Sequence, residues 1–205
     1  MNLRESLRLY VITDHGLARG RDEVAVVRAA LKGGATAIQL RGKGQDARAL
    51  CELGRALLRE TQAAGALLFV NDRLDVAQAI GADGVHLGQD DLRCADARRI
   101  AGAGLLIGVS AESPRLAAAA KSDGADYVGT GSVYATSSKP DAGEPIGLPG
   151  LQAVVEATDL PVVAIGGISA SNAAPCLAAG ACGVAVISAV IGAQDPEAAA
   201  RAFFR

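Results

Sequence analysis

The chain has 205 residues, of which 50% are hydrophobic and 20% charged, and this balance fits one globular domain with a substantial core. Lys and Arg total 20 against 22 Asp and Glu, and only 3% of residues are aromatic, so no nucleic-acid partner is expected. The N-terminal segment lacks the apolar core of a signal peptide, and no run approaches the ~20 apolar residues that span a bilayer. The protein is therefore expected to be cytoplasmic and to have no membrane partner.

The four cysteines, Cys51, Cys94, Cys176 and Cys182, are scattered without CxxC spacing. Small buried thiols in a reducing compartment explain this pattern better than zinc or disulfides. Any bound metal is therefore expected to have oxygen ligands.

Apolar runs alternate with segments of helical spacing along the whole chain. Strands are expected at 9–13, 37–43, 67–70, 85–87, 105–109, 127–133, 161–167 and 183–188. Helices are expected at 22–32, 46–64, 73–80, 94–101, 114–122, 148–157, 171–179 and 196–204, with Ser113 as an N-cap. The pattern predicts eight strands and eight helices.

The segments GGATAIQL, GADGVHLG, GADYVGTG and GACGVAVI each place a small-residue turn before an apolar strand. Units of roughly 25 residues over this length favour an α/β fold, a single (β/α)8 TIM barrel spanning 1–205. An open doubly wound sheet is the alternative, but its GxGxxG turn is missing.

Acidic and amide side chains follow two neighbouring strands in the segment 67–91. Asn71 and Asp72 end one apolar run, and Asp90 and Asp91 follow the next. In a barrel both exits lie at the carboxyl ends of the strands, where carboxylates suit a hard cation such as Mg2+. Alternatively, Asp72 and Asp91 only cap helices.

Other strand exits carry cations, hydroxyls and small residues. The cations and polar groups are Gln39, Arg41, Lys43 and Ser110, and the candidate phosphate seat is Gly166, Gly167, Ile187 and Ser188. Together with a metal they point to two phosphorylated ligands. Three alternatives stay open: Arg41 in a structural ion pair, the glycine pair in close packing, and Asp14 as a helix cap. Neither His15 nor His86 is given a role.

The loop 136–147 is long for a connection between a strand and a helix and is rich in Pro and Gly. It contains Thr136, Ser137, Ser138 and Lys139, and it is expected to act as a lid over the ligands.

These motifs together resemble the thiamine-phosphate synthase family over nearly the whole chain, from Tyr10 to Ser188. They are QLRGK at 39–43, ND at 71–72, GADGVHLGQDDL at 81–92, GVS at 108–110, GTGSVYATSSKPDAG at 129–143, AIGGIS at 164–169 and GVAVISA at 183–189. The resemblance implies a transferase of thiamine biosynthesis. It joins 4-amino-2-methyl-5-(diphosphooxymethyl)pyrimidine to a thiazole phosphate, giving thiamine monophosphate and pyrophosphate with Mg2+ as cofactor.

The resemblance also implies roles for individual residues. The pyrimidine diphosphate would be held by Gln39, Leu40, Arg41, Gly42, Lys43, Asn71, Ser110 and Lys139. The thiazole phosphate would be held by Thr136, Ser137, Ser138, Gly167, Ile187 and Ser188, and Mg2+ by Asp72 and Asp91. The residues implied in catalysis are Arg41, Lys43, Ser110 and Lys139.

One position departs from the family pattern. The family usually has QLREK in the second strand, whereas Gly42 stands here in place of Glu, so an ion pair is lost and Lys43 is expected on a looser backbone.

Two alternative functions are kept. One is a TenI-type thiazole tautomerase, whose relatives carry a His where this chain has Glu112. The other is a non-catalytic phosphate-binding module, which needs neither metal carboxylates nor a lid lysine. The sequence leaves open whether the protein forms a homo-oligomer.

Overall fold

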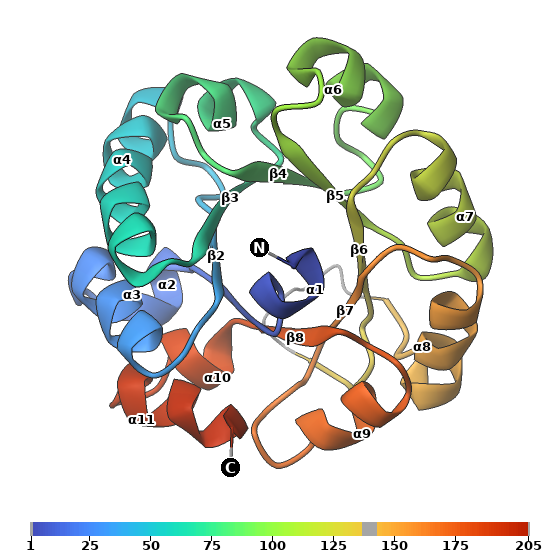
Figure 1. Ribbon diagram of the computed structural model, residues 1–205. Coiled ribbons are helices and arrows are strands. Elements are labelled where there is room, and N and C mark those ends of the chain that lie inside the picture. Colours follow the sequence, from blue (N-terminus) through green and yellow to red (C-terminus); the bar gives the residue numbers. More distant parts are fainter. Residues whose placement is uncertain (1, 137–142, 205) are drawn as a thin grey trace.

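The computed structural model describes residues 2–136 and 143–204, and its strands close into a parallel barrel in chain order (Figure 1). The strands are β1 (Leu9–Ile12), β2 (Ala37–Leu40), β3 (Leu67–Asn71), β4 (Gly84–Leu87), β5 (Leu106–Ser110), β6 (Tyr127–Thr130), β7 (Val162–Ile165) and β8 (Gly183–Val186). Each strand pairs with the next, and β8 returns to β1 with Tyr10 opposite Ala185. The prediction of a (β/α)8 barrel is confirmed.

Helices surround the barrel. They are α2 (His15–Ala18), α3 (Glu23–Lys32), α4 (Ala47–Ala64), α5 (Leu74–Ile80), α6 (Cys94–Ala101), α7 (Pro114–Ser122), α8 (Gly147–Glu156), α9 (Ala173–Ala178), α10 (Ser188–Ile191) and α11 (Pro196–Arg201), followed by the 3-10 turn η1 (Ala202–Phe204). The short helix α1 (Leu3–Ser6) precedes β1 and lies across the centre of the ring in Figure 1. The amino ends of the strands are therefore covered, and a ligand has to enter from the opposite end.

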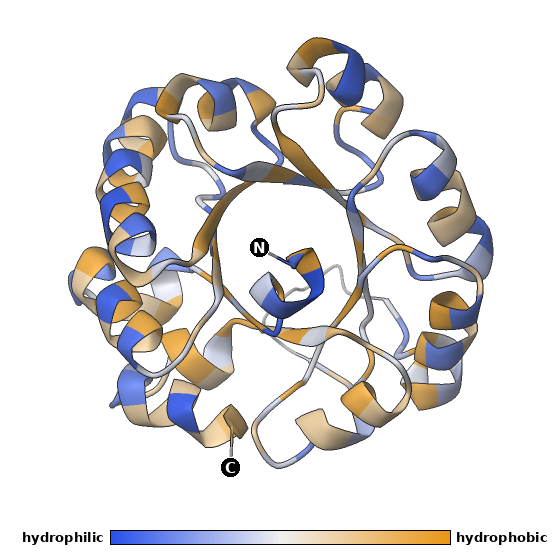
Figure 2. Cartoon of the chain, viewed as in Figure 1, coloured by the Kyte–Doolittle hydropathy of each residue, from blue (hydrophilic) through white to orange (hydrophobic). Residues whose placement is uncertain are grey.

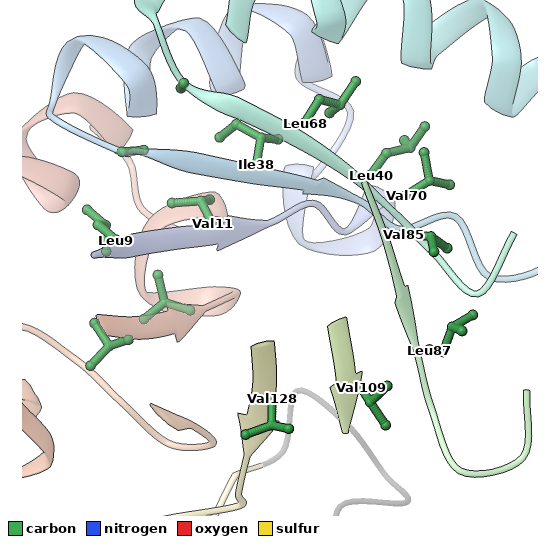
Figure 3. Packing of buried hydrophobic residues seen from close by; sticks show 14 of the residues in the cluster. Leu9, Val11, Ile38, Leu40, Leu68, Val70, Val85, Leu87, Val109 and Val128 are labelled. Carbon is green, nitrogen blue, oxygen red and sulfur yellow. The ribbon is translucent and has the colours of Figure 1, made fainter. Parts of the chain in front are cut away.

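Alternation along the strands divides the buried side chains into two groups. Leu9 and Val11 pack outward against the helices, whereas Tyr10 and Ile12 belong to a separate cluster inside the barrel. Figure 3 shows the outer group, and Figure 2 shows polar residues on the solvent side of the helices. This period-2 pattern is the one that a strand buried on both faces requires.

Large aromatic residues fill the barrel interior. Phe69 packs against Tyr10 and Tyr127 with ring centroids 5.3 Å from each, and Val163 and Ala185 complete the layer. Tyr10 and Tyr127 line the space at the carboxyl ends of the strands, so this layer forms its floor.

Several predicted boundaries are too long. Strand β7 ends at Ile165 instead of residue 167, because Gly166 and Gly167 take φ values of 102° and 63° and leave the extended conformation. Strand β8 ends at Val186, and β6 ends at Thr130. The helices α1, α2 and α10 were not predicted, since four residues are too few to show a helical period. The predicted N-cap is confirmed, because Ser113 Oγ accepts from Leu116 N.

A core deletion should show how far stability depends on the outer layer. Leu57 in α4 is fully buried, so Leu57→Ala is expected to lower the free energy of unfolding by roughly 2–5 kcal/mol. Arg59→Ala, at an exposed position of the same helix, is the control and should change it by less than about 0.5 kcal/mol. Urea denaturation measures both, and equal effects would mean that α4 is not packed as described.

Candidate functional site

A cavity of about 670 Å³ opens among the carboxyl ends of the strands. Its walls include predicted site residues from five strand exits and the loop after β6. These are Gln39, Arg41, Asn71, Ser110, Thr136, Gly167, Ile187 and Ser188. Residues far apart in the chain thus meet where the sequence predicts a ligand site.

The remaining predicted residues fall into two groups. Some are described but do not line this cavity, and the others lie outside the described part of the chain. Leu40 is buried in the outer layer among the helices, so its side chain faces away from the barrel interior. Gly42, Lys43, Asp72 and Asp91 are absent from the described cavity walls. Ser137, Ser138 and Lys139, and with them the predicted lid, lie outside the described residues.

Asp72 and Asp91 form a carboxylate pair beside the cavity. Burial, and then a side-chain hydrogen bond and charge repulsion from Asp91, raise the pKa of Asp72 to about 7, while Lys43 and Arg41 act in the opposite direction. Gly88 N donates to Asp91 Oδ2 at 2.7 Å. Two carboxylates in contact, with cations near them, are a donor set that suits a divalent cation.

Helix capping, the alternative for this pair, is wrong. The N-cap residues of α5 and α6 are Arg73 and Arg93, and neither helix has a side-chain cap. Asp72 instead takes a left-handed conformation with φ 62°, which turns the chain directly after β3. Within 2–136 and 143–204 no cluster of three or more His, Cys, Asp or Glu side chains is placed to hold a metal. The protein's carboxylate contribution there is this pair.

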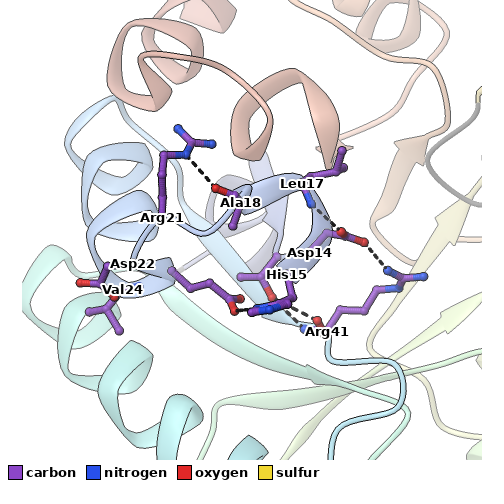
Figure 4. A network of polar contacts seen from close by, with 10 residues as sticks. Asp14, His15, Leu17, Ala18, Arg21, Asp22, Val24 and Arg41 are labelled. Atoms are coloured by element: carbon purple, nitrogen blue, oxygen red, sulfur yellow. Dashed lines mark hydrogen bonds and ion pairs between the residues drawn. The ribbon is translucent and has the colours of Figure 1, made fainter.

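Arg41 has a fixed partner at the mouth of β1. Its Nη1 donates to Asp14 Oδ2 at 2.9 Å (Figure 4). Its backbone N–H donates to Thr13 Oγ1. Asp14 also caps α2 by accepting from Leu17 N at 3.0 Å. The predicted ion pair and the predicted cap are therefore both present, and Arg41 still lines the cavity.

Gly42 sits in a tight turn. Gln45 N donates to its carbonyl oxygen, and a Cβ at this position would lie 2.6 Å from both Gln45 Oε1 and Leu50 Cδ2. The left-handed glycine of the segment is Gly44, with φ 79°. A larger residue at position 42 would thus have to displace the two neighbouring side chains.

The glycine pair after β7 brings backbone close to the cavity. A Cβ on Gly167 would lie 2.4 Å from the carbonyl oxygen of Ala135, and one on Gly166 would lie 2.5 Å from Ser132 Cα. Both glycines line the cavity, as do Ile187 and Ser188 at the start of α10. The glycine pair is thus closely packed and also brings its backbone to the cavity wall.

His86 and Tyr127 were missed by the sequence interpretation. His86 lines the cavity, with Nδ1 3.0 Å from Tyr127 OH and Nε2 3.1 Å from Ser110 Oγ. The sequence did contain a signal for His86, because it alternates with the apolar residues Val85 and Leu87. These two face outward, so His86 between them lies on the interior face.

Comparison with known families decides what kind of protein carries this cavity. The family model described as thiamine monophosphate synthase matches residues 9–190. The chain belongs to the thiamine-phosphate synthase family.

Members of the thiamine-phosphate synthase family resemble the chain over nearly its full length. The thiamine-phosphate synthase of Roseiflexus castenholzii is 57% identical over 194 residues, which cover 95% of this chain and 85% of the relative. That of Moorella thermoacetica is 56% identical, over 94% of this chain and 92% of the relative. The structure of thiamine phosphate pyrophosphorylase from Pyrococcus furiosus superposes with a TM-score of 0.92 at 48% identity, covering 99% and 96% of the two chains.

The helices offer no candidate for crossing a membrane. Across residues 2–136 and 143–204, none combines the length and apolar character that a membrane span needs.

Proposed function

We propose that this chain joins 4-amino-2-methyl-5-(diphosphooxymethyl)pyrimidine to a thiazole phosphate, forming thiamine monophosphate and pyrophosphate. The observation that carries the proposal is that one cavity has Gln39, Arg41 and Ser110 on one side and the backbone of Gly167 and Ser188 on the other. Two phosphorylated ligands can then be held face to face, which membership of the family supports.

The pyrimidine diphosphate lies on the side of β2, β3 and β5 in this proposal. Gln39, Asn71 and Ser110 offer amide and hydroxyl groups to the ring, and Arg41 offers charge to the diphosphate. Lys43 also contributes positive charge, because it lies close enough to Asp72 to act against the rise in that residue's pKa. The assignment of Lys139 to the diphosphate, and of Ser137 and Ser138 to the thiazole phosphate, rests on the resemblance alone.

Asp72 and Asp91 are the residues that would hold Mg2+. The fit is supported by their mutual contact and by the raised pKa of Asp72, because a cation would offset the burial and the contact with Asp91 that now favour a proton there. When bound there, Mg2+ would supply positive charge beside the departing pyrophosphate.

The side chains then have three tasks. The C–O bond to pyrophosphate breaks with its electron pair leaving on oxygen, and the thiazole nitrogen supplies the pair for the new C–N bond. Arg41 and Lys43 stabilise the leaving anion, and the cavity walls hold the two ligands in line and restrict water. No protein nucleophile is required.

The phosphate seat gives a test by steric exclusion. Gly167→Val is expected to raise the KM for thiazole phosphate by at least about tenfold, because the side chain would meet Ala135 and Tyr134 and push the wall into the cavity. Steady-state kinetics with the pyrimidine diphosphate saturating measures this effect. Gly65→Val at another left-handed glycine, with open space around it, is the matched control for backbone strain. Equal KM values in the two variants would remove the phosphate from this corner.

The substrate pair tests the proposed function. Purified protein with Mg2+ is expected to release pyrophosphate when both substrates are present and to release little when either is omitted. Rapid release from the pyrimidine diphosphate alone would indicate a hydrolase, and no release at all would contradict the proposal.

A tautomerase is the alternative function, and no described residue of the cavity favours it. Glu112 lines the cavity where the related tautomerases carry a His. The protein is therefore expected not to isomerise a carboxylated thiazole phosphate in the absence of the pyrimidine, which can be followed by the ultraviolet spectrum of the thiazole.

A further inference from the structure

A continuous series of side-chain hydrogen bonds crosses the barrel floor and ends at two cavity walls. Gln39 Nε2 donates to Tyr10 OH at 3.0 Å, and Tyr10 OH lies 2.9 Å from Tyr127 OH. Tyr127 OH lies 3.0 Å from His86 Nδ1, and His86 Nε2 lies 3.1 Å from Ser110 Oγ. We call these five residues the relay. Its two ends, Gln39 and Ser110, lie on β2 and β5.

The orientation of the Gln39 amide sets the direction in which the relay donates, and burial carries that direction from one member to the next. Tyr10 and Tyr127 are 2% and 0% exposed, so each hydroxyl hydrogen needs an acceptor inside the protein. Because Tyr10 accepts from Gln39, it donates to Tyr127, the other hydrogen-bond partner that the described residues give it. Tyr127 therefore donates to His86 Nδ1.

The direction sets the tautomer of the imidazole. With Nδ1 accepting, the neutral ring of His86 carries its proton on Nε2 and donates to Ser110 Oγ. The hydroxyl hydrogen of Ser110 is then directed away from His86, and Gln39 keeps Oε1 as an acceptor. Reversing one member would require reversing all of them, including the amide of Gln39.

We propose that His86, Tyr127 and Tyr10 are positioning residues that fix Gln39 as an acceptor and Ser110 as a donor toward an aminopyrimidine. This inference rests on the proposed function, which supplies the pyrimidine. A 4-aminopyrimidine offers an amine that donates and ring nitrogens that accept, so it matches this polarity. A 4-oxopyrimidine has a carbonyl in place of the amine and leaves Gln39 Oε1 facing another acceptor. The relay thereby selects the amino form.

The tautomer can be measured in the ligand-free protein. The chain has two histidines, so 15N NMR of ring-labelled protein, with His15→Gln to assign the signals, isolates His86. In the neutral ring Nδ1 is expected to appear as an unprotonated acceptor and Nε2 as protonated. A proton on Nδ1 would mean that the relay runs the other way and would overturn the proposal.

Selectivity can be measured by binding alone. Calorimetry with 4-amino-5-hydroxymethyl-2-methylpyrimidine and its 4-oxo counterpart should give wild-type affinities that differ by about tenfold or more. Tyr127→Phe leaves Tyr10 without its acceptor and favours turning of the Gln39 amide, so this ratio should fall at least about threefold. Tyr10→Phe should also lower the ratio while leaving the His86 tautomer unchanged, since Tyr127 can still donate to Nδ1.

Phe69→Leu is the matched control. Phe69 packs against both tyrosines and has no hydroxyl, so this variant disturbs the floor without breaking the relay and should keep the wild-type ratio. An unchanged ratio in Tyr10→Phe, or an equal loss in Phe69→Leu, would overturn the relay while the proposed function stands. If the wild type binds neither pyrimidine, the relay contributes no recognition of the ring and fails, and the coupling reaction with the diphosphate decides the proposed function separately. If Tyr127→Phe does not fold, the wild-type tautomer and Tyr10→Phe still decide.

Discussion

Arg41→Met is expected to lower kcat/KM for the pyrimidine diphosphate by about 10^2 to 10^3-fold, the range found when a preorganised charge or donor is removed from a developing anion. Arg41 lines the cavity and is held by Asp14 at 2.9 Å, with its side chain only 12% exposed. Its guanidinium is therefore already aligned before substrate arrives, and methionine keeps the apolar stem while removing the charge. Steady-state kinetics and circular dichroism of the same preparations separate lost turnover from lost structure.

Asp14→Asn is the control for the ion pair. It keeps an oxygen for the α2 cap but weakens the hold on Arg41, so a smaller loss, about tenfold or less, is expected. If Asp14→Asn and Arg41→Met lose the same activity, the role of Arg41 is to support the fold at the mouth of β1, and its assignment to the diphosphate is wrong.

Asp72→Asn is expected to abolish the response to Mg2+ and to lower turnover by about 10^2-fold or more. Asparagine is the informative replacement, because residue 72 has φ 62° and asparagine tolerates this conformation better than alanine does. The change removes one charge from the pair with Asp91 without forcing the turn after β3 to move. Titration of Mg2+, by calorimetry and by activity, measures the effect.

Asp75→Asn is the matched control for this variant. Asp75 lies three residues further on, in α5, and forms an ion pair with Arg73 at the surface. It should keep the wild-type Mg2+ dependence. A wild-type Mg2+ titration in Asp72→Asn would show that the metal binds elsewhere, and a loss shared by both variants would point to α5 as a whole.

The barrel could be predicted because its signals are local. Apolar strand cores such as 67–70 and small-residue turns before the strands are visible in the sequence, and parallel strands then bring their carboxyl ends together. The end of β7 could not be placed, since Gly166 and Gly167 leave the extended conformation where Ser132 and Ala135 approach from the neighbouring segment.

The sequence predicted which residues follow the strands, but it did not predict which of these side chains pair with one another. Gln39 and Arg41 alternate with Ile38 and Leu40 in the sequence, which puts them on one face of the chain, and both line the cavity. Arg41 pairs with Asp14, 27 positions away, because β1 lies beside β2 in the folded barrel. His86 was set aside because a lone histidine is more often a structural or exposed residue than a functional one, and the alternation that places it inside the barrel does not show its partners. Its role depends on Tyr127, 41 positions further on, which reaches it only across the closed barrel.

The central claim is that one cavity joins two phosphorylated ligands, and 31P NMR of a single reaction tests it most directly. With the pyrimidine diphosphate, the thiazole phosphate and Mg2+ in one tube, thiamine monophosphate and pyrophosphate are expected to appear in equal amounts, at the rate at which both substrates disappear. Pyrophosphate in excess of thiamine monophosphate, or loss of the diphosphate signal with the thiazole phosphate unchanged, would contradict the account.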